Sequence, residues 1–242
     1  MKQAMAVHGR TVPRRATISA APSALVHLGW FAAGSAIAFL APYVFSSRLE
    51  LQHDVYYVIY FAVALAFLGA YATTTRADLA GLFRRNWRWS LALSVPVSAF
   101  LVANVFSRES TAGVSDGYLA FELGWRGVAY GVVDALVLTA FPGLVAFSLL
   151  AGDLRGLRRK AMYVALMLPL VLFITGVYHY GYAQFREDGV GGPLTGNAII
   201  SIPMIVTANP VGSIVAHASM HVAAEAHSHE TDLFLPPQTN AD

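Results

Sequence analysis

The sequence predicts an all-α protein: a polytopic integral membrane helical bundle of about six to eight helices. Hydrophobic residues make up 56% of the chain and charged residues only 12%, about half the charged share of an ordinary soluble domain. The charges are also segregated, because four stretches contain no Asp, Glu, Lys or Arg: residues 22–47, 55–75, 89–107 and 161–185. Each stretch reaches the roughly 18 apolar residues that indicate a membrane-spanning helix.

The apolar stretches and their flanks give the expected helices, which are residues 23–46, 55–75, 88–107, 127–151 and 161–185, followed by a broken pair at 196–207 and 210–227. We expect the break at Asn209-Pro210, near the middle of the membrane, because proline lacks an N–H donor and disfavours helix at the residue before it. The helical transmembrane domain is therefore expected at residues 21–227. A basic tail, 1–20, precedes it, and an exposed C-terminal tail, 228–242, follows it.

Basic residues gather in three segments, which set the expected orientation. These segments are the N-terminus, the loop after 55–75 and the loop after 127–151, with Arg10, Arg14, Arg15, Arg76, Arg84, Arg85, Arg88, Arg155, Arg158, Arg159 and Lys160. Because loops rich in Lys and Arg stay on the cytoplasmic side, the N-terminal tail is expected in the cytoplasm, in a multi-pass protein of the plasma or inner membrane. Residues 108–126 and 186–196 are then expected on the outer side.

The composition also excludes several kinds of site and partner. The chain has no cysteine, which excludes disulfides, thiolate metal sites and cysteine nucleophiles. Its net charge is only +2, and its basic residues lie between apolar stretches. This pattern favours topology signals over contacts with nucleic acid. Membrane lipid is therefore an expected partner, and nucleic acid is not.

Ionisable residues in the membrane segments are candidates for function, because a charge in the bilayer is costly. The candidates are Glu122, Arg126, Asp134, His179, His217, His221 and Glu225. His217 and His221 are four residues apart and share one helix face, the geometry that lets two imidazoles bind one metal ion. The alternative is a pair of buried histidines bonded to backbone or hydroxyl groups. Asp134 is interpreted as structural.

The other two candidate elements also have two interpretations each. His179 lies among three tyrosines, so it either joins the other histidines at a metal or belongs to an interfacial aromatic belt. Glu122 and Arg126 are four residues apart and can pair on a helix. They are therefore either catalytic or a structural ion pair.

The segment FELGWRG, residues 121–127, resembles the first motif of the CPBP family (CAAX protease and bacteriocin-processing, Rce1-like intramembrane proteases). That motif has two adjacent glutamates, three further residues and an arginine, often followed by glycine. Glu122, Arg126 and Gly127 match it. The histidines of the second and third motifs resemble His179 and His217, and the resemblance covers roughly residues 118–226.

Three positions depart from the family pattern. Phe121 stands where the family has its first glutamate, which activates water. Thr175 stands where a phenylalanine usually precedes the second histidine, and His221 replaces an asparagine that stabilises an oxyanion. The resemblance therefore implies a divergent member, either with rebuilt chemistry or without catalysis.

Together with these residues, the resemblance implies a divergent CPBP-like, metal-dependent intramembrane protease or hydrolase that acts on a peptide bond in or near the membrane. Its expected substrate or partner is then a peptide or a membrane protein. Glu122, Arg126, His179 and His217 are the expected catalytic residues, with Glu122 as general base. His179, His217 and His221 are expected to bind zinc or another divalent metal and leave one position for water. The alternative is an inactive relative, a membrane scaffold or regulatory protein whose histidines form a structural network or hold a structural metal. A transporter is the third hypothesis.

Overall fold

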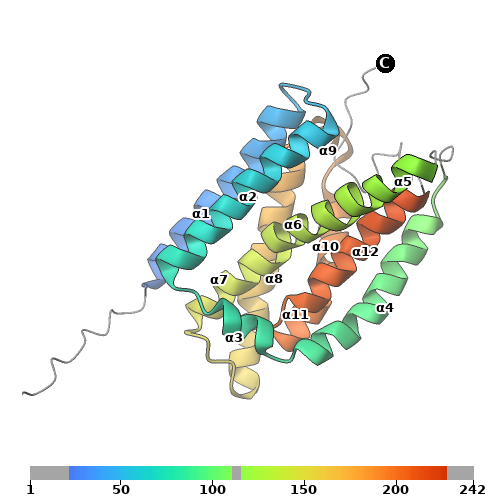
Figure 1. The fold of residues 1–242 in the computed structure, drawn as a ribbon. Coiled ribbons are helices and arrows are strands. Elements are labelled where there is room, and N and C mark those ends of the chain that lie inside the picture. The colour runs from blue at the N-terminus through green and yellow to red at the C-terminus, as the bar shows by residue number, and fades with distance from the viewer. Residues whose placement is uncertain (1–21, 111–115, 228–242) are drawn as a thin grey trace, which may run out of the picture.

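The structure is a computed structural model that describes residues 22–110 and 116–227, and the regular structure of these residues is entirely helical (Figure 1). The expected tails, 1–20 and 228–242, lie outside the described residues. Five helical segments are long and apolar enough to cross a membrane. The all-α membrane bundle expected from the sequence is therefore confirmed.

Four of the spanning segments correspond to expected helices. They are α1 (Ala24–Ala41) with its π-helical continuation η1 (Pro42–Ser46), α2 (His53–Thr75), α4 (Trp87–Phe106) and α8 (Gly156–Tyr180). The expected helix 161–185 is displaced, because α8 begins and ends five residues earlier. Its first turns contain Arg158, Arg159 and Lys160. Long basic side chains at a helix end can extend to the membrane surface, so these charges lie within the helix and do not mark its start.

The fifth span is a composite helix that contains two π-helical segments. It consists of α5 (Asp116–Glu122), η2 (Leu123–Ala129), α6 (Tyr130–Ala135), η3 (Leu136–Ala140) and α7 (Phe141–Leu149). The expected helix 127–151 began too late, because Glu122 and Arg126 were placed in a loop before it or at its start. In the structure both lie within the helix, where Arg126 Nη1 is 3.0 Å from Glu122 Oε1.

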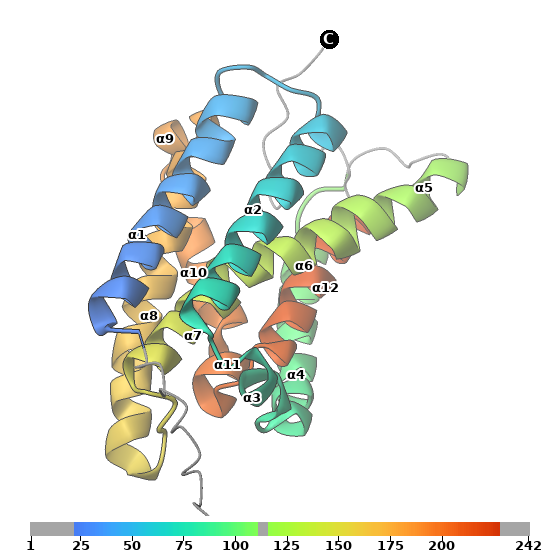
Figure 2. The same ribbon diagram turned by 60° about the vertical axis from the view of Figure 1, so that its left-hand side comes forward.

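The composite helix is the centre of the bundle. In its most apolar window 78% of the residues are buried, against 28–33% in the other four spans. In two views α1 and α2 lie on one side of it, and α4 and α12 (Val211–His227) lie on the other (Figures 1 and 2). Because protein surrounds this helix, its polar side chains are kept away from lipid.

Two glycines allow the composite helix to approach α12 closely. A Cβ atom added at Gly127 would lie 2.9 Å from Val222 Cγ2, and one added at Gly131 would lie 2.7 Å from Ala218 Cα. Small residues at a helix interface in a membrane permit such close backbone contact. Polar side chains on the facing surfaces of these two helices are therefore brought within hydrogen-bonding distance.

Four further helices are shorter: α3 (Leu79–Arg84), α9 (Ala183–Asp188), α10 (Gly191–Ile200) and α11 (Ile202–Thr207). Helices α3 and α9 are additional to those expected from the sequence. The expected segment 196–207 is two helices, α10 and α11, and it starts five residues earlier than expected, at Gly191.

The last pair of helices breaks at the expected residues, but the break lies at one end of the bundle and not near its middle. Ser90, in the first turn of α4, donates a hydrogen bond from Oγ to Asn209 O at 2.8 Å and accepts one from Gly212 N at 2.9 Å. At the other end of α12, His227 Nε2 is 2.8 Å from the carbonyl oxygen of Arg108, just beyond α4. Helix α12 therefore runs beside α4 along almost its whole length, and its two central histidines lie deep in the bundle.

The basic loops lie at one end of the bundle, as the expected alternation requires. The guanidinium of Arg85, between α3 and α4, is 5.9 Å from the ring centre of Phe147 near the end of α7. At the start of α1, His27 Nδ1 is 3.0 Å from the hydroxyl of Tyr71 near the end of α2. The start of α1 and the ends of α2 and α7 are thus close together (Figure 1).

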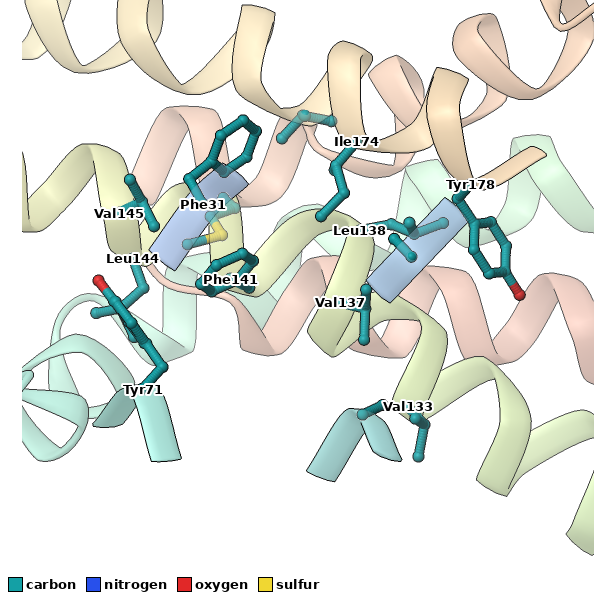
Figure 3. Close-up of a cluster of buried hydrophobic side chains, with 14 of the residues drawn as sticks. Phe31, Tyr71, Val133, Val137, Leu138, Phe141, Leu144, Val145, Ile174 and Tyr178 are labelled. Carbon is teal, nitrogen blue, oxygen red and sulfur yellow. The ribbon is translucent and has the colours of Figure 1, made fainter. Parts of the chain in front are cut away.

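A cluster of buried aromatic and aliphatic side chains joins α1, α2, the composite helix and α8. The ring of Phe141 lies 6.1 Å from that of Phe31 and 5.2 Å from that of Tyr71. Figure 3 shows these rings together with Leu138 and Ile174, which come from η3 and α8. Their burial supplies the packing that holds the central helix in place, and the polar site lies next to this cluster.

Candidate metal centre

Three buried side chains from the composite helix and α12 form a compact group of possible metal ligands. One ligand atom from each of Asp134, His217 and His221 lies within 4.8 Å of the other two. Their exposed fractions are 2%, 3% and 3%. In the part of the chain that the structure describes, this is the one such group of three or more His, Asp or Glu side chains.

Asp134 is the best-bonded member of the group. The hydroxyl of Tyr60, on α2, donates to Asp134 Oδ1 at 2.9 Å, and His217 Nε2 is 3.3 Å from Asp134 Oδ2. A carboxylate held in this way is oriented toward the histidines, as supporting hydrogen bonds orient the ligands of metal sites.

The two histidines, by contrast, have unused nitrogens. Their rings stack with centres 5.0 Å apart and planes 17° apart. His217 Nδ1 and both ring nitrogens of His221 have no hydrogen-bond partner among the described residues. A buried polar atom without a partner costs about 1–3 kcal/mol, and a cation bound through one nitrogen of each imidazole would reduce that cost. The Asp–His–His group could therefore hold a metal ion.

Tyr130 fixes the position of His221. Its ring meets the imidazole edge to face, with centres 4.8 Å apart and planes at 85°. The hydroxyl of Tyr130 is bonded to that of Tyr178 on α8 at 2.7 Å. From Tyr178 the chain of hydroxyls continues to Tyr182 at 2.8 Å and on to Tyr56 at 2.7 Å. The imidazole is thus packed against a ring that α8 and α2 hold in place.

The group opens into a pocket of about 610 Å³. Its lining includes Asp134, His217 and His221 together with His179 and Asn197. A volume of this size is typical of pockets that bind small molecules or part of a larger ligand. The metal-ligating group therefore faces a space that a ligand can enter.

His179 lines the same pocket but is not part of the compact group. Its Nδ1 is 2.9 Å from the carbonyl oxygen of Thr175, one turn earlier in α8. Since a carbonyl oxygen only accepts, this contact requires the proton on Nδ1 and leaves Nε2 as an acceptor. The structure therefore brings His179 to the site expected from the sequence, while Asp134, interpreted there as structural, is the third member of the compact group.

Asn197 joins three helices beside the pocket. Its Nδ2 donates to Thr175 Oγ1 at 2.6 Å and to the carbonyl oxygen of Leu138 at 3.3 Å. Its Oδ1 accepts from Thr139 Oγ1 at 3.1 Å. Because both amide hydrogens are used, Asn197 serves to position α8, η3 and α10 and has no donor left for a ligand.

Glu122 and Arg126 lie in a second polar cluster, apart from the metal-ligating group. Arg126 bonds to Glu122 at 3.0 Å, and it also contacts both carboxylate oxygens of Asp54, on α2, at 3.2 Å. Neither Glu122 nor Arg126 lines the pocket. Glu122 and Asp134 are twelve positions apart along the composite helix, which is about three helical turns. The ion pair expected from the spacing is thus present, and the structure does not bring it to the histidines.

The fold and this site define a polytopic membrane protein with a buried carboxylate–dihistidine group at its centre. Comparison of the chain with protein-family models, with curated proteins and with solved structures finds no match.

Proposed function

We propose that this protein is a membrane-embedded, metal-dependent hydrolase that acts on a peptide bond in or near the membrane. The observation that carries the proposal is the buried Asp134–His217–His221 group. Three of its four histidine nitrogens have no partner among the described residues, and the group faces a pocket of about 610 Å³. Three protein ligands with one position open are typical of catalytic zinc sites.

Zinc is the favoured metal, and another divalent ion is the alternative. Two imidazoles and one carboxylate suit zinc, and the same set with open positions also suits ferrous iron. Such an ion, when bound, supplies a Lewis acid that polarises a carbonyl group and makes a water molecule more acidic. The proposed ligands differ from those expected from the sequence in that Asp134 takes the place of His179.

We assign proton transfer to His179. Its Nδ1–H is held by the carbonyl oxygen of Thr175 at 2.9 Å, so its Nε2 can accept a proton in the pocket. Glu122, the general base expected from the sequence, does not line this pocket. In this proposal Glu122 and Arg126 instead support the structure at the outer end of the bundle.

The peptide substrate and the membrane location are further parts of the proposal. The resemblance of residues 121–127 to an intramembrane protease motif favours a peptide bond over other hydrolysable bonds. The basic loops at one end of the bundle support an N-terminus in the cytoplasm, in a plasma or inner membrane.

The proposal is tested with purified protein in liposomes that contain a panel of membrane-spanning peptides, each with a fluorophore and a quencher. We expect cleavage by the wild type, loss of cleavage with chelator or in His217→Ala, and a decrease of about 10²–10⁴ in kcat for His179→Ala. His227→Ala, on the same helix as His217 but outside the pocket, should cleave normally. Cleavage that persists in both chelator and His217→Ala would contradict the proposal.

One observation favours the second candidate, an inactive membrane scaffold or regulatory protein. Phe121, at the position of the family's first glutamate, is 47% exposed and lies near Tyr118 and Trp125, with ring centres 5.3 and 6.4 Å away. An apolar, outward-facing side chain at this position cannot activate water. In such a protein the histidines would bind metal without hydrolysing any peptide of the panel.

A further inference from the structure

The second polar cluster also includes Glu225, so that Asp54, Glu122 and Glu225 lie around a single arginine, Arg126. Asp54, Glu122 and Glu225 supply three carboxylates, and Arg126 supplies one guanidinium, so the net charge is −2 when all four are ionised. Arg126 is shared between Asp54 and Glu122. Glu225 is close enough to the other three for electrostatic interaction with each.

Glu225 is the residue that this arrangement leaves unexplained. It is 0% exposed, and neither of its carboxylate oxygens has a hydrogen-bond partner among the described residues. An ionised carboxylate in this position is strongly unfavourable unless a cation or several donors compensate it.

Two other oxygens near Glu225 are also unpartnered. Glu122 Oε2 is buried and lacks a partner, although Oε1 of the same carboxylate is bonded to Arg126. The hydroxyl of Tyr57, on α2, is fully buried, lacks a partner and interacts electrostatically with Glu225. Four oxygens thus lack partners among the described residues: three carboxylate oxygens, from Glu122 on α5 and Glu225 on α12, and the hydroxyl oxygen of Tyr57 on α2.

We propose that Glu122, Glu225 and Tyr57 form a second, oxygen-only cation site that binds a divalent ion such as calcium or magnesium. Carboxylate oxygens are the ligands that these hard cations prefer. A charge of +2 also balances the net −2 of the cluster, whereas a proton or a monovalent ion would leave it at −1.

This site is separate from the Asp134–His217–His221 group. The rings of Tyr57 and Tyr130 stack with centres 4.6 Å apart, and Tyr130 in turn contacts His221. The stacked pair lies between the two clusters, so calcium at one and zinc at the other can be tested independently. Because its ligands come from α2, α5 and α12, a cation bound there would link these three helices.

The test is the unfolding temperature of chelator-treated protein in detergent, titrated with calcium, with magnesium and, at matched ionic strength, with sodium. We expect a saturable rise with a divalent ion and none with sodium. Glu225→Gln should weaken the response by more than about tenfold, the change that 1.4 kcal/mol produces. Asp134→Asn should retain the response, because its altered residue lies in the other group.

Several results would overturn the proposal: no saturable rise in the wild type, an equal rise with sodium, an undiminished rise in Glu225→Gln, or a rise lost in Asp134→Asn. Should Glu225→Gln fail to fold, Glu122→Gln takes its place with the same expectation. Infrared difference spectra of wild type against Glu225→Gln provide a second readout. A carbonyl band from a protonated Glu225 that persists in saturating calcium would show that a proton, and not a metal ion, neutralises this carboxylate.

Discussion

In buffer free of calcium and magnesium, a chelator is expected to lower the unfolding temperature of the wild-type protein. The same treatment should leave the unfolding temperature of Asp134→Asn almost unchanged. A metal that binds only the folded state stabilises it by about 2.7 kcal/mol at a free concentration of 100 times its Kd. For a chain of this length that corresponds to about 5–10 °C. The Asp134→Asn variant lacks the negatively charged carboxylate ligand and should bind the metal poorly. Its unfolding temperature without chelator should therefore equal that of the wild type with chelator.

The substitution is chosen because it preserves the surrounding contacts. An asparagine oxygen can still accept the hydrogen bond that Tyr60 donates to Asp134 at 2.9 Å, so the fold should be retained. Asp153→Asn is the matched control, since this carboxylate lies in the loop before α8 and pairs with Arg155. It should respond to chelator as the wild type does. A full chelator response in Asp134→Asn would show that Asp134 is not a metal ligand.

Asn209→Ala is expected to destabilise the fold by at least about 2 kcal/mol. The side-chain amide nitrogen of Asn209 contacts three carbonyl oxygens at and beyond the end of α3, those of Leu82, Phe83 and Arg85, at 3.0, 2.8 and 2.7 Å. Its Oδ1 accepts from Val211 N at 2.9 Å. The substitution leaves these buried or half-buried groups without partners, at about 1–3 kcal/mol for each that water does not reach.

The substitution should also weaken metal binding, because Asn209 fixes the start of α12, the helix that contains His217 and His221. The measurement is the unfolding temperature in detergent, together with metal content. Ser219→Ala is the control on the same helix, since among the described residues the hydroxyl of Ser219 bonds only to the carbonyl oxygen of Val215, one turn earlier. Its effect should stay within about 0.5 kcal/mol. An Asn209→Ala protein as stable as Ser219→Ala would contradict the role assigned to this turn.

Most of the fold follows from the sequence because the length of an apolar, uncharged stretch is a local property. The expected helices 55–75 and 88–107 match α2 and α4 to within two residues at each end. The start of the composite helix could not be predicted from the sequence, because two charged residues, Glu122 and Arg126, are typical of a loop. Two opposite charges one turn apart neutralise each other within a helix, and a charge count cannot distinguish that pair from a polar loop.

The site was only partly predictable, because its members meet through tertiary contacts. The spacing of His217 and His221 was sufficient to place both on one face. Asp134, 83 residues before His217 in the chain, reaches it because Gly131 admits the backbone of α12. The available signal was that Asp134 is the one charged residue in 127–152. An isolated carboxylate in a buried span requires a partner. On that ground Asp134 was a better candidate than His179 for the third metal ligand.

The central claim is that Asp134, His217 and His221 bind one metal ion, and metal content by mass spectrometry tests it most directly. The protein is purified in detergent without chelator, as wild type and as His217→Ala, His221→Ala and His227→Ala. We predict close to one equivalent of zinc or another transition metal per chain in the wild type and in His227→Ala, and its loss in the other two variants. Wild-type protein without such metal, or variants at positions 217 and 221 that retain it, would contradict the claim.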